Sequence, residues 1–322
     1  PQLSYNQKII QYNLCIVNFK NNNMQIVLTG SFGRIGKPLT QSLVKNGHSV
    51  TVITSKIERQ IEIEAIGAKA AIGSMQDVDF LTTTFKGADV VYLMIAWDAI
   101  GNIFDKGIDF PTEFLNIAHK YKQAIEQSGV KNVVQLSSIG AHTNTGIGSL
   151  SIYNGVEQIM NQLPTDISIK YMRPVAFYPN IYRFMQTIKS DNAIIQSYGG
   201  DTKEPWVSPL DIADAIVEEI ETPFKARTFH YIASDEISPN EVATILGNAI
   251  NNNLKWLVIP AEQLLNGAIA SGMNEWVAKG FVEMQAAQGS GILYEDFYKN
   301  KPTLGKIKLT DFAQDFAQMY NQ

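Results

Sequence analysis

Cysteine, clustered basic residues and long apolar runs are all scarce in this sequence. The single Cys15 cannot form an internal disulfide, and the four histidines have no zinc-ligand spacing with Cys15 or with one another. The formal net charge of −5, without Lys/Arg clusters, argues against a surface that binds nucleic acid directly. No apolar run is long enough to cross a bilayer. We therefore expect a soluble, cytoplasmic, enzyme-like protein without a metal.

Regular periodicity is also missing from residues 1–23, where Asn, Gln and Ile are crowded together. Lys8 and scattered polar residues interrupt any apolar segment that a signal peptide would need, and no small-residue cleavage site follows. We expect this segment to be a poorly packed N-terminal extension.

The most informative region, residues 24–55, reads as a strand, a glycine-rich turn, a helix and a second strand. The apolar run 24–28 is typical of a strand buried in a parallel sheet, and the turn 29–36 leads directly into a helix over 37–46. A second strand over 49–54 follows at the distance that a βαβ unit requires. The order of these elements is that of a nucleotide-binding fold.

Three glycines in the turn have separate physical roles. Gly30 can adopt the backbone angles of a tight turn, Gly33 lets the main chain approach a pyrophosphate, and Gly36 allows close packing of helix on strand. The free amides and the positive dipole end of the helix suit a phosphate. Three glycines alone are also consistent with an ordinary loop, but their place between a strand and a helix favours nucleotide binding.

The same alternation of strands and helices continues beyond this unit. We expect further strands over 68–72, 88–95, 130–136 and 167–172, and helices over 58–66, 77–85, 110–128 and 152–162. Repeated βα units indicate an α/β protein with a doubly wound parallel sheet, the Rossmann fold. The spacing becomes irregular after Arg173-Pro174. We therefore expect a dinucleotide-binding domain over 24–174 and a smaller C-terminal α/β substrate lobe over 175–322, with segments that return to the sheet.

Several motifs give the chain a family resemblance. They are the glycine motif 29–36, Gly87-Ala88-Asp89-Val90-Val91, Ser137-Ser138-Ile139-Gly140-Ala141, Arg173-Pro174, Trp206-Val207-Ser208-Pro209-Leu210-Asp211-Ile212-Ala213, Ser238-Pro239-Asn240-Glu241, Leu304-Gly305-Lys306 and Leu309-Thr310-Asp311-Phe312-Ala313. With them the chain resembles the NmrA-like branch of the atypical short-chain dehydrogenases/reductases, from Met24 almost to its C-terminus. The resemblance implies a Rossmann domain that binds NAD(H) or NADP(H) and a C-terminal lobe that closes over it.

The resemblance leaves three classes of function open. The first is an NADPH-dependent reductase of a small flat carbonyl or quinone-like acceptor, and the second is a dinucleotide-binding redox sensor or regulator without turnover. The third, a sugar-nucleotide epimerase or dehydratase, is disfavoured because those enzymes generally use a Tyr-x-x-x-Lys pair that is absent here. We expect a dinucleotide and a small molecule as ligands, no membrane partner, and a monomer or homodimer.

The candidate catalytic residues depart from the wider superfamily. Its members usually carry Tyr-x-x-x-Lys, in which the ammonium lowers the pKa of the tyrosine. Here Tyr153 is followed four residues later by Glu157, and a carboxylate one helical turn away would disfavour the phenolate. Ser138 stands where the superfamily has a substrate-orienting hydroxyl. Tyr153 and Ser138 are the catalytic candidates, with local backbone bonding as the alternative role for the serines 137 and 138.

The end of the second strand bears on the choice of cofactor. An NAD enzyme usually has Asp or Glu there, whereas Thr54-Ser55-Lys56, with Arg34 in the glycine loop, would suit a 2′-phosphate. We therefore expect NADP(H), with NAD(H) as the alternative, although similar NADP binders often carry Arg at the position of Ser55. The residues expected to contact the cofactor are Gly30, Ser31, Phe32, Gly33, Arg34, Ile35, Gly36, Ser55, Lys56, Ala96, Trp97 and Ser137.

Aromatic residues after the strand ends are candidates for a substrate slot. Hydride chemistry belongs to the cofactor, so the protein must mainly position a flat acceptor and exclude water. Trp97, Phe177 and Tyr178 are the predicted substrate-binding residues, and Trp206 could complete a flat apolar slot. Each of them could equally be a core residue at the lobe interface.

Overall fold

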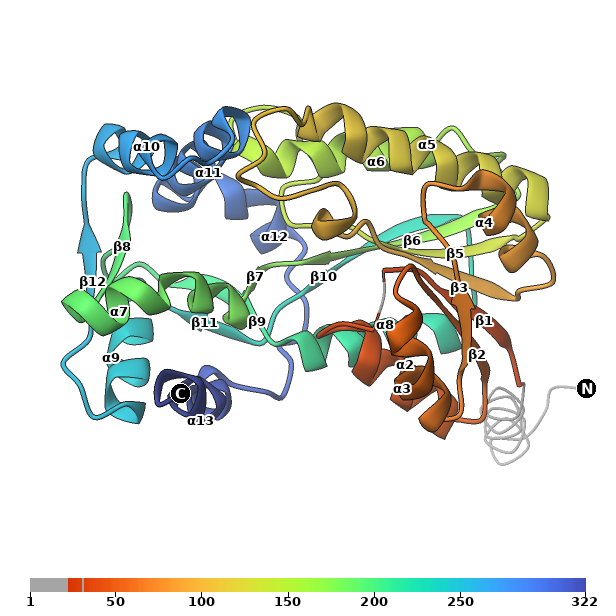
Figure 1. Ribbon diagram of the computed structural model, residues 1–322, viewed down its shortest axis with the longest axis horizontal. Coiled ribbons are helices and arrows are strands. Elements are labelled where there is room, and N and C mark those ends of the chain that lie inside the picture. The colour runs from red at the N-terminus through yellow and green to blue at the C-terminus, as the bar shows by residue number, and fades with distance from the viewer. Residues whose placement is uncertain (1–22, 31) are drawn as a thin grey trace, which may run out of the picture.

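The computed structural model describes residues 23–30 and 32–322 (Figure 1). Except for Asn23, the expected N-terminal extension lies outside the described residues, and so does Ser31.

The centre of the molecule is a seven-stranded sheet in which every neighbouring pair of strands is parallel. Its strands are β1 (Gln25–Leu28), β2 (Ser49–Thr54), β3 (Lys69–Ile72), β4 (Val90–Leu93), β5 (Asn132–Leu136), β6 (Ser168–Pro174) and β10 (Arg227–Ile232). They lie in the order β10-β6-β5-β4-β1-β2-β3, so the direction of winding reverses between β1 and β4. This is the doubly wound order of the Rossmann fold, which confirms the predicted fold class.

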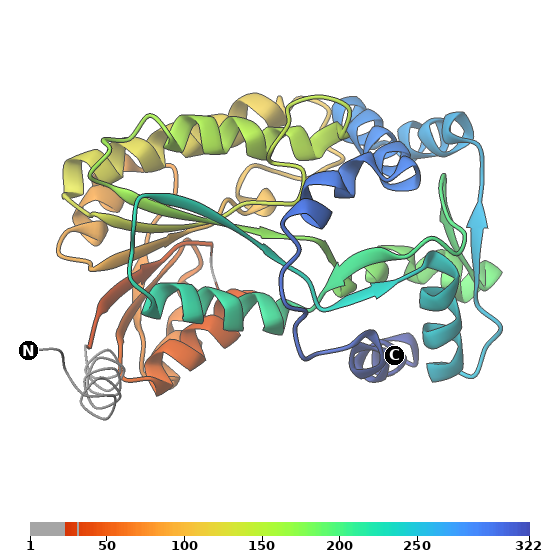
Figure 2. The same ribbon diagram turned by 180° about the vertical axis from the view of Figure 1, so that it is seen from behind.

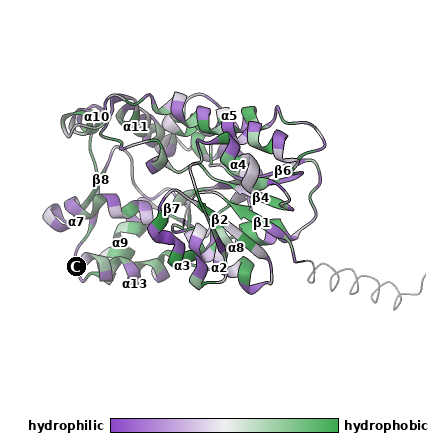
Figure 3. Ribbon diagram, turned by 45° about the vertical axis from the view of Figure 1, so that its right-hand side comes forward, coloured by the Kyte–Doolittle hydropathy of each residue, from purple (hydrophilic) through white to green (hydrophobic). Residues whose placement is uncertain are grey.

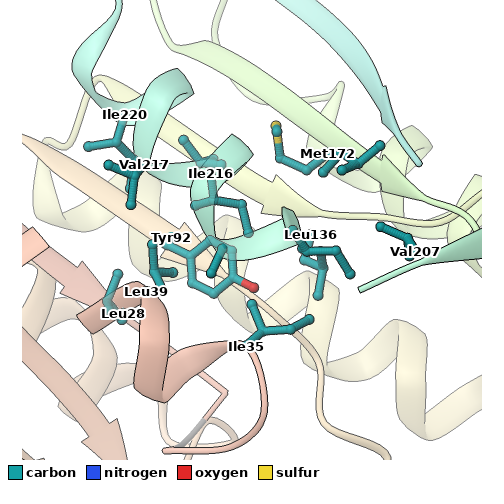
Figure 4. Packing of buried hydrophobic residues seen from close by; sticks show 14 of the residues in the cluster. Leu28, Ile35, Leu39, Tyr92, Leu136, Met172, Val207, Ile216, Val217 and Ile220 are labelled. Atoms are coloured by element: carbon teal, nitrogen blue, oxygen red, sulfur yellow. The ribbon is translucent and has the colours of Figure 1, made fainter. Parts of the chain in front are cut away.

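Helices cover both faces of this sheet (Figure 1). One face carries α2 (Gly36–Lys45), α3 (Gln60–Ala65) and α8 (Pro209–Glu221), and the other carries α4 (Val78–Phe85), α5 (Phe110–Ser128) and α6 (Ile152–Met160). Each face of the sheet has its own apolar core, so β4 is buried on both sides. Val90 and Tyr92 belong to the core under α2 and α8, and Val91 and Leu93 belong to the core under α4, α5 and α6. Figure 4 shows the α2 and α8 side, where Leu39, Ile216 and Val217 surround Tyr92.

Local signals account for where several helices begin and end. The Asp109 carboxylate accepts a hydrogen bond from the Thr112 amide at the start of α5, and Gly129 ends that helix at φ +82°. In α9 (Pro239–Ala249), Ser238 and Glu241 form a reciprocal capping box. The Ser238-Pro239-Asn240-Glu241 motif therefore marks the N-terminus of this helix.

Several predicted elements differ from the observed ones at their edges, and two of these differences involve 3₁₀ turns. The strand expected over 88–95 spans only Val90–Leu93, because Met94 to Trp97 leave the sheet and continue into a 3₁₀ turn, η2 (Trp97–Ala99). The helix expected over 58–66 begins as the 3₁₀ turn η1 (Ile57–Arg59) and becomes α-helical only in α3.

The C-terminal lobe is built from small sheets and short helices (Figure 2). A three-stranded sheet joins β7 (Ala176–Phe177), β9 (Glu204–Val207) and β11 (Asp235–Ile237), and β8 (Ala193–Gln196) pairs with β12 (Lys255–Val258). The remaining elements are η3 (Gly148–Ser151), η4 (Tyr178–Phe184), α7 (Met185–Asp191), α10 (Ala261–Ala270), α11 (Glu275–Ser290), η5 (Ile292–Tyr294), α12 (Glu295–Lys299) and α13 (Leu309–Tyr320). Hydrophobic residues concentrate on the strands and inner helix faces (Figure 3). Between the lobe elements, α8 and β10 return to the large sheet.

A buried carboxylate fastens the C-terminal segment to the body of the protein. Asp211, at the start of α8, accepts hydrogen bonds from the amides of Lys306 and Ile307 and from the Ser234 hydroxyl. A Cβ at Gly305 would lie 2.3 Å from the Asp211 carboxylate, so the close approach requires glycine. The Trp206 to Ala213 motif thus connects the lobe to the last helix.

Candidate active site

A cavity of about 1040 Å³ lies between the sheet and the lobe. Residues that follow strands of the large sheet line one wall: Ile35 after β1, Ile95 and Trp97 after β4, and Ser137 and Ser138 after β5. The cavity therefore opens at the carboxyl ends of β1 and β4, where the winding of a doubly wound sheet reverses and ligands bind.

The lobe supplies the opposite wall, which is mainly apolar. From η4 come Asn180, Ile181, Arg183 and Phe184, from α10 Gln263, Leu264, Gly267 and Ala268, and from α11 Val277, Phe281, Met284 and Gln288. Gln196, Tyr198, Trp206, Leu293 and Tyr294 also line the cavity. This size and lining suit an aromatic small molecule together with part of a dinucleotide.

The glycine loop has the geometry that a phosphate site requires. Gly30 has φ +87°, and a Cβ there would lie 2.5 Å from the Met94 sulfur. At Gly33 a Cβ would meet nothing within 4 Å, so the main chain is open on that side. The first turn of α2 holds no acidic residue and no side-chain cap, which leaves the positive end of its dipole available to an anion. These features fit a dinucleotide.

The predicted 2′-phosphate residues are on the surface beside this loop. Arg34, Ser55 and Lys56 are exposed, and neither cation forms an ion pair in the described part of the chain. The Arg34 guanidinium lies 5.4 Å from the centre of the Tyr182 ring in η4, so the loop reaches the lobe. No carboxylate occupies positions 54–56.

Ser137 belongs to a buried ionic network. Its hydroxyl donates to Glu157 Oε1 at 2.6 Å, while Arg173 donates from Nε at 2.9 Å and from Nη2 at 2.6 Å to the same carboxylate. Burial works to lower the pKa of the Arg173 guanidinium, but the Glu157 hydrogen bond and charge outweigh it and raise the pKa. Asp296 lies 3.6 Å from the other side of Arg173, so the cation is compensated twice.

Tyr153 and Ser138 both line the cavity, and the structure changes the argument about Glu157. The Glu157 carboxylate is paired with Arg173 and is not among the causes of the shift at Tyr153. Burial instead raises the pKa of the Tyr153 phenol. The tyrosine is therefore a proton-holding group at neutral pH, as expected, but the cause is desolvation and not the neighbouring carboxylate.

The predicted aromatic slot forms only in part. Trp97 lines the cavity and packs on Phe110, Phe114 and Trp276 with ring centres 5.3 to 6.5 Å apart. Phe177 and Trp206 also line it. Tyr178 does not lie on this wall, because it is buried in the lobe core, where its hydroxyl donates to Asp235 Oδ2 at 2.7 Å.

Sequence reasoning missed two charged residues at the lobe side of the cavity. Glu204 is buried and accepts hydrogen bonds from the Tyr198 and Tyr294 hydroxyls at 3.1 and 2.7 Å. Burial raises the pKa of this carboxyl to about 7. Arg183 extends into the cavity from η4. No local pattern marks either residue, because their neighbours come from distant segments of the chain.

The part of the chain that the structure describes contains neither a metal-binding cluster nor a membrane-spanning helix. Residues 23–30 and 32–322 hold no group of three or more His, Cys, Asp or Glu side chains arranged to bind a metal ion. Over the same ranges, every helix is too short or too polar to cross a membrane.

Comparisons with known proteins agree with this architecture. A sequence model of the NmrA-like family matches residues 22–308. An NAD(P)H azoreductase of Xenophilus azovorans is 21% identical over 262 residues, which cover 81% of this chain and 86% of that protein. The NADPH complex of a quinone oxidoreductase from Escherichia coli superposes with a TM-score of 0.74 at 16% identity, covering 90% of this chain and 99% of that one. A nucleoside-diphosphate-sugar epimerase of Staphylococcus aureus gives 0.70 at 17% identity, with coverage of 90% and 100%.

Proposed function

The chain belongs to the NmrA-like family, and on that premise we propose that it is an NAD(P)H-dependent oxidoreductase that reduces a small flat carbonyl or quinone-like acceptor. The observation that carries this proposal is the cavity, which runs from Ile35 in the glycine loop to a large aromatic-lined space in the lobe. Such a cavity can hold a flat acceptor against the end of a dinucleotide.

The cofactor would be held by the glycine loop and by cations beside it. The amides of the 30–36 loop and the α2 dipole take the pyrophosphate, and Arg34, Ser55 and Lys56 take a 2′-phosphate. Ala96, Trp97 and Ser137 then border the nicotinamide, which supplies a hydride when bound. The absence of a carboxylate at 54–56 supports NADP(H) over NAD(H).

The substrate end would use aromatic walls and one phenol. Trp97 and Phe177 position the acceptor and keep water out. Tyr153 is protonated at neutral pH, as a phenol ordinarily is, so it can donate that proton to a carbonyl oxygen as the oxygen gains charge, with Ser138 orienting the acceptor. Burial raises its pKa, which keeps the phenolate from forming in the absence of substrate. Quinones can take their proton from solvent instead.

The comparisons support this chemistry over the alternatives. The azoreductase and the quinone oxidoreductase act, by their names, on planar acceptors with NAD(P)H or NADPH. The epimerase neighbour has the same fold, but the Tyr-x-x-x-Lys lysine is replaced here by Glu157, which is occupied with Arg173. A dinucleotide-binding sensor without turnover remains the alternative that an experiment must exclude.

The first test is fluorescence titration with NADPH and NADH, followed by turnover with quinones, azo compounds and aldehydes. Tighter NADPH binding with acceptor-dependent oxidation supports the proposal, binding without turnover favours the sensor, and no binding refutes both. Gly33→Asp is the matched variant, because its side chain meets no neighbour yet places a carboxylate beside the phosphate site. It should weaken NADPH binding at least tenfold with an unchanged Tm, whereas Gln41→Asp on the exposed side of α2 should not.

A further inference from the structure

Arg183 is the one permanently charged side chain among the described residues that line the cavity. The other lining residues are apolar, aromatic, hydroxyl or amide side chains. Arginine stays protonated at every physiological pH. The lobe wall therefore carries one fixed positive charge within a space otherwise suited to an aromatic molecule.

The guanidinium has aromatic neighbours but no carboxylate. It lies 5.4 Å from the centre of the Phe281 ring and 5.9 Å from that of Phe184, and its Nε donates to the Asn180 carbonyl at 2.9 Å. No ion pair of Arg183 occurs within residues 23–30 and 32–322. Burial lowers its pKa, although the side chain stays accessible to solvent, as a group on a cavity wall does. The guanidinium therefore keeps free N–H donors, which can form charge-assisted hydrogen bonds with an anion that enters the cavity.

A second polar group of the cavity also has unused hydrogen-bonding capacity. Gln196 at the end of β8 is buried, and its amide oxygen has no hydrogen-bond partner in the described structure. Strand β8 packs against η4, which carries Arg183. Gln196 also lines the cavity, so its side-chain N–H₂ group could join the guanidinium on one ligand.

The position of Arg183 separates it from the phosphate site. Its neighbour Tyr182 faces Arg34 of the glycine loop and packs on Phe316 of α13. Arg183 instead stacks on Phe281, in the middle of α11. Successive residues of η4 thus contact different elements: Tyr182 contacts the glycine loop and α13, and Arg183 contacts α11.

We propose that Arg183 selects a flat aromatic acceptor that carries an anionic substituent, a carboxylate or sulfonate, on the edge facing η4. The guanidinium N–H groups donate to the oxygens of the carboxylate or sulfonate, and the rings of Phe281 and Phe184 hold the guanidinium in position. The aromatic rings of the acceptor occupy the apolar part of the cavity toward Trp97 and Phe177. This inference rests on the proposed reductase function but concerns only the recognition of the acceptor.

The test compares two ligands of nearly equal shape, naphthalene-2-sulfonate and naphthalene-2-sulfonamide, which cannot be reduced under the conditions of the assay. Calorimetric titration of the full chain, with and without NADP⁺, should give at least tenfold tighter binding of the sulfonate, as one charge-assisted contact provides. Arg183→Gln should remove that preference, and Arg183→Lys should retain part of it. Lys189→Gln, which removes the same charge from the outer face of α7, should leave it unchanged.

Several outcomes would overturn the inference. Equal binding of the two ligands by the wild-type protein would do so without any variant, which covers the case in which Arg183→Gln does not fold. Loss of NADPH binding in Arg183→Gln, with the sulfonate preference intact, would assign the residue to the cofactor. A sulfonate preference in a protein that reduces no acceptor would sustain anion recognition while refuting the reductase proposal, so the two failures are distinguishable.

Discussion

The two sides of the cavity differ in whether their charged side chains have partners of opposite charge. On the sheet wall, Glu157 is bound by two nitrogens of Arg173 and by the Ser137 hydroxyl, so both charges are compensated within the protein. On the lobe side, Glu204 lies behind the lining residues Tyr198 and Tyr294 and has only their hydroxyls as partners, and Arg183, which lines the cavity, has only aromatic and carbonyl ones. A compensated pair is costly to break, whereas an uncompensated group remains able to respond to a proton or a ligand.

The largest expected effect is on the compensated wall. Glu157→Ala would leave the buried Arg173 with only the partly exposed Asp296 as a carboxylate partner, and we expect the free energy of unfolding to fall by up to about 3 to 5 kcal/mol in urea denaturation. The double variant Glu157→Leu/Arg173→Met should recover most of this loss because it removes both charges. Glu262→Ala, at an exposed position of α10, is the control. A loss below about 1 kcal/mol in Glu157→Ala would mean that the pair does not hold this wall.

Glu204 should make the stability of the lobe depend on pH. Its folded pKa of about 7 lies above the ordinary value of 4.5, so the folded protein favours the protonated form. The associated stability is fully present below pH 4.5 and is lost as the pH rises through about 7. The difference between wild type and Glu204→Gln should therefore shift by about 3 kcal/mol over this window, with the variant gaining at high pH. A difference independent of pH would contradict the raised pKa.

Tyr153→Phe tests the proton donor of the sheet wall. Reduction of an aldehyde or ketone should slow by roughly 100-fold, because the alkoxide loses its proton donor, while reduction of a quinone should change much less. The measurement is kcat for both substrate classes with NADPH. Tyr298→Phe, a surface tyrosine outside the cavity, is the matched control. Equal slowing of both classes would point to a packing role for the ring.

The smallest effect is expected from the charge of the lobe wall. Arg183→Gln should change the free energy of unfolding by less than about 1 kcal/mol, because no buried carboxylate loses its partner. Urea denaturation of this variant beside Glu157→Ala measures the contrast directly. If Arg183→Gln lowers the free energy of unfolding as much as Glu157→Ala does, then Arg183 has a structural partner, and the charged groups on both sides of the cavity are compensated within the protein.

The sequence was sufficient for the fold class and for the place of the glycine loop between β1 and α2. The glycine loop, the buried β4 and the Ser238 cap depend on residues within a few positions of one another, and local backbone preferences act over that range. Parallel strands linked by helices then have few permitted arrangements. The seven-stranded sheet agrees with this expectation in being parallel and doubly wound.

Tertiary packing alone decided the chemistry of the cavity walls. Glu157 and Arg173 are 16 residues apart, on α6 and β6, and Tyr294 meets Glu204 across 90 residues of sequence. The sequence determined which residue types stand at the strand ends, but it could not determine which charges become partners. That depends on how the lobe folds back over the sheet, because electrostatic energies and pKa shifts are set by distance and burial in space.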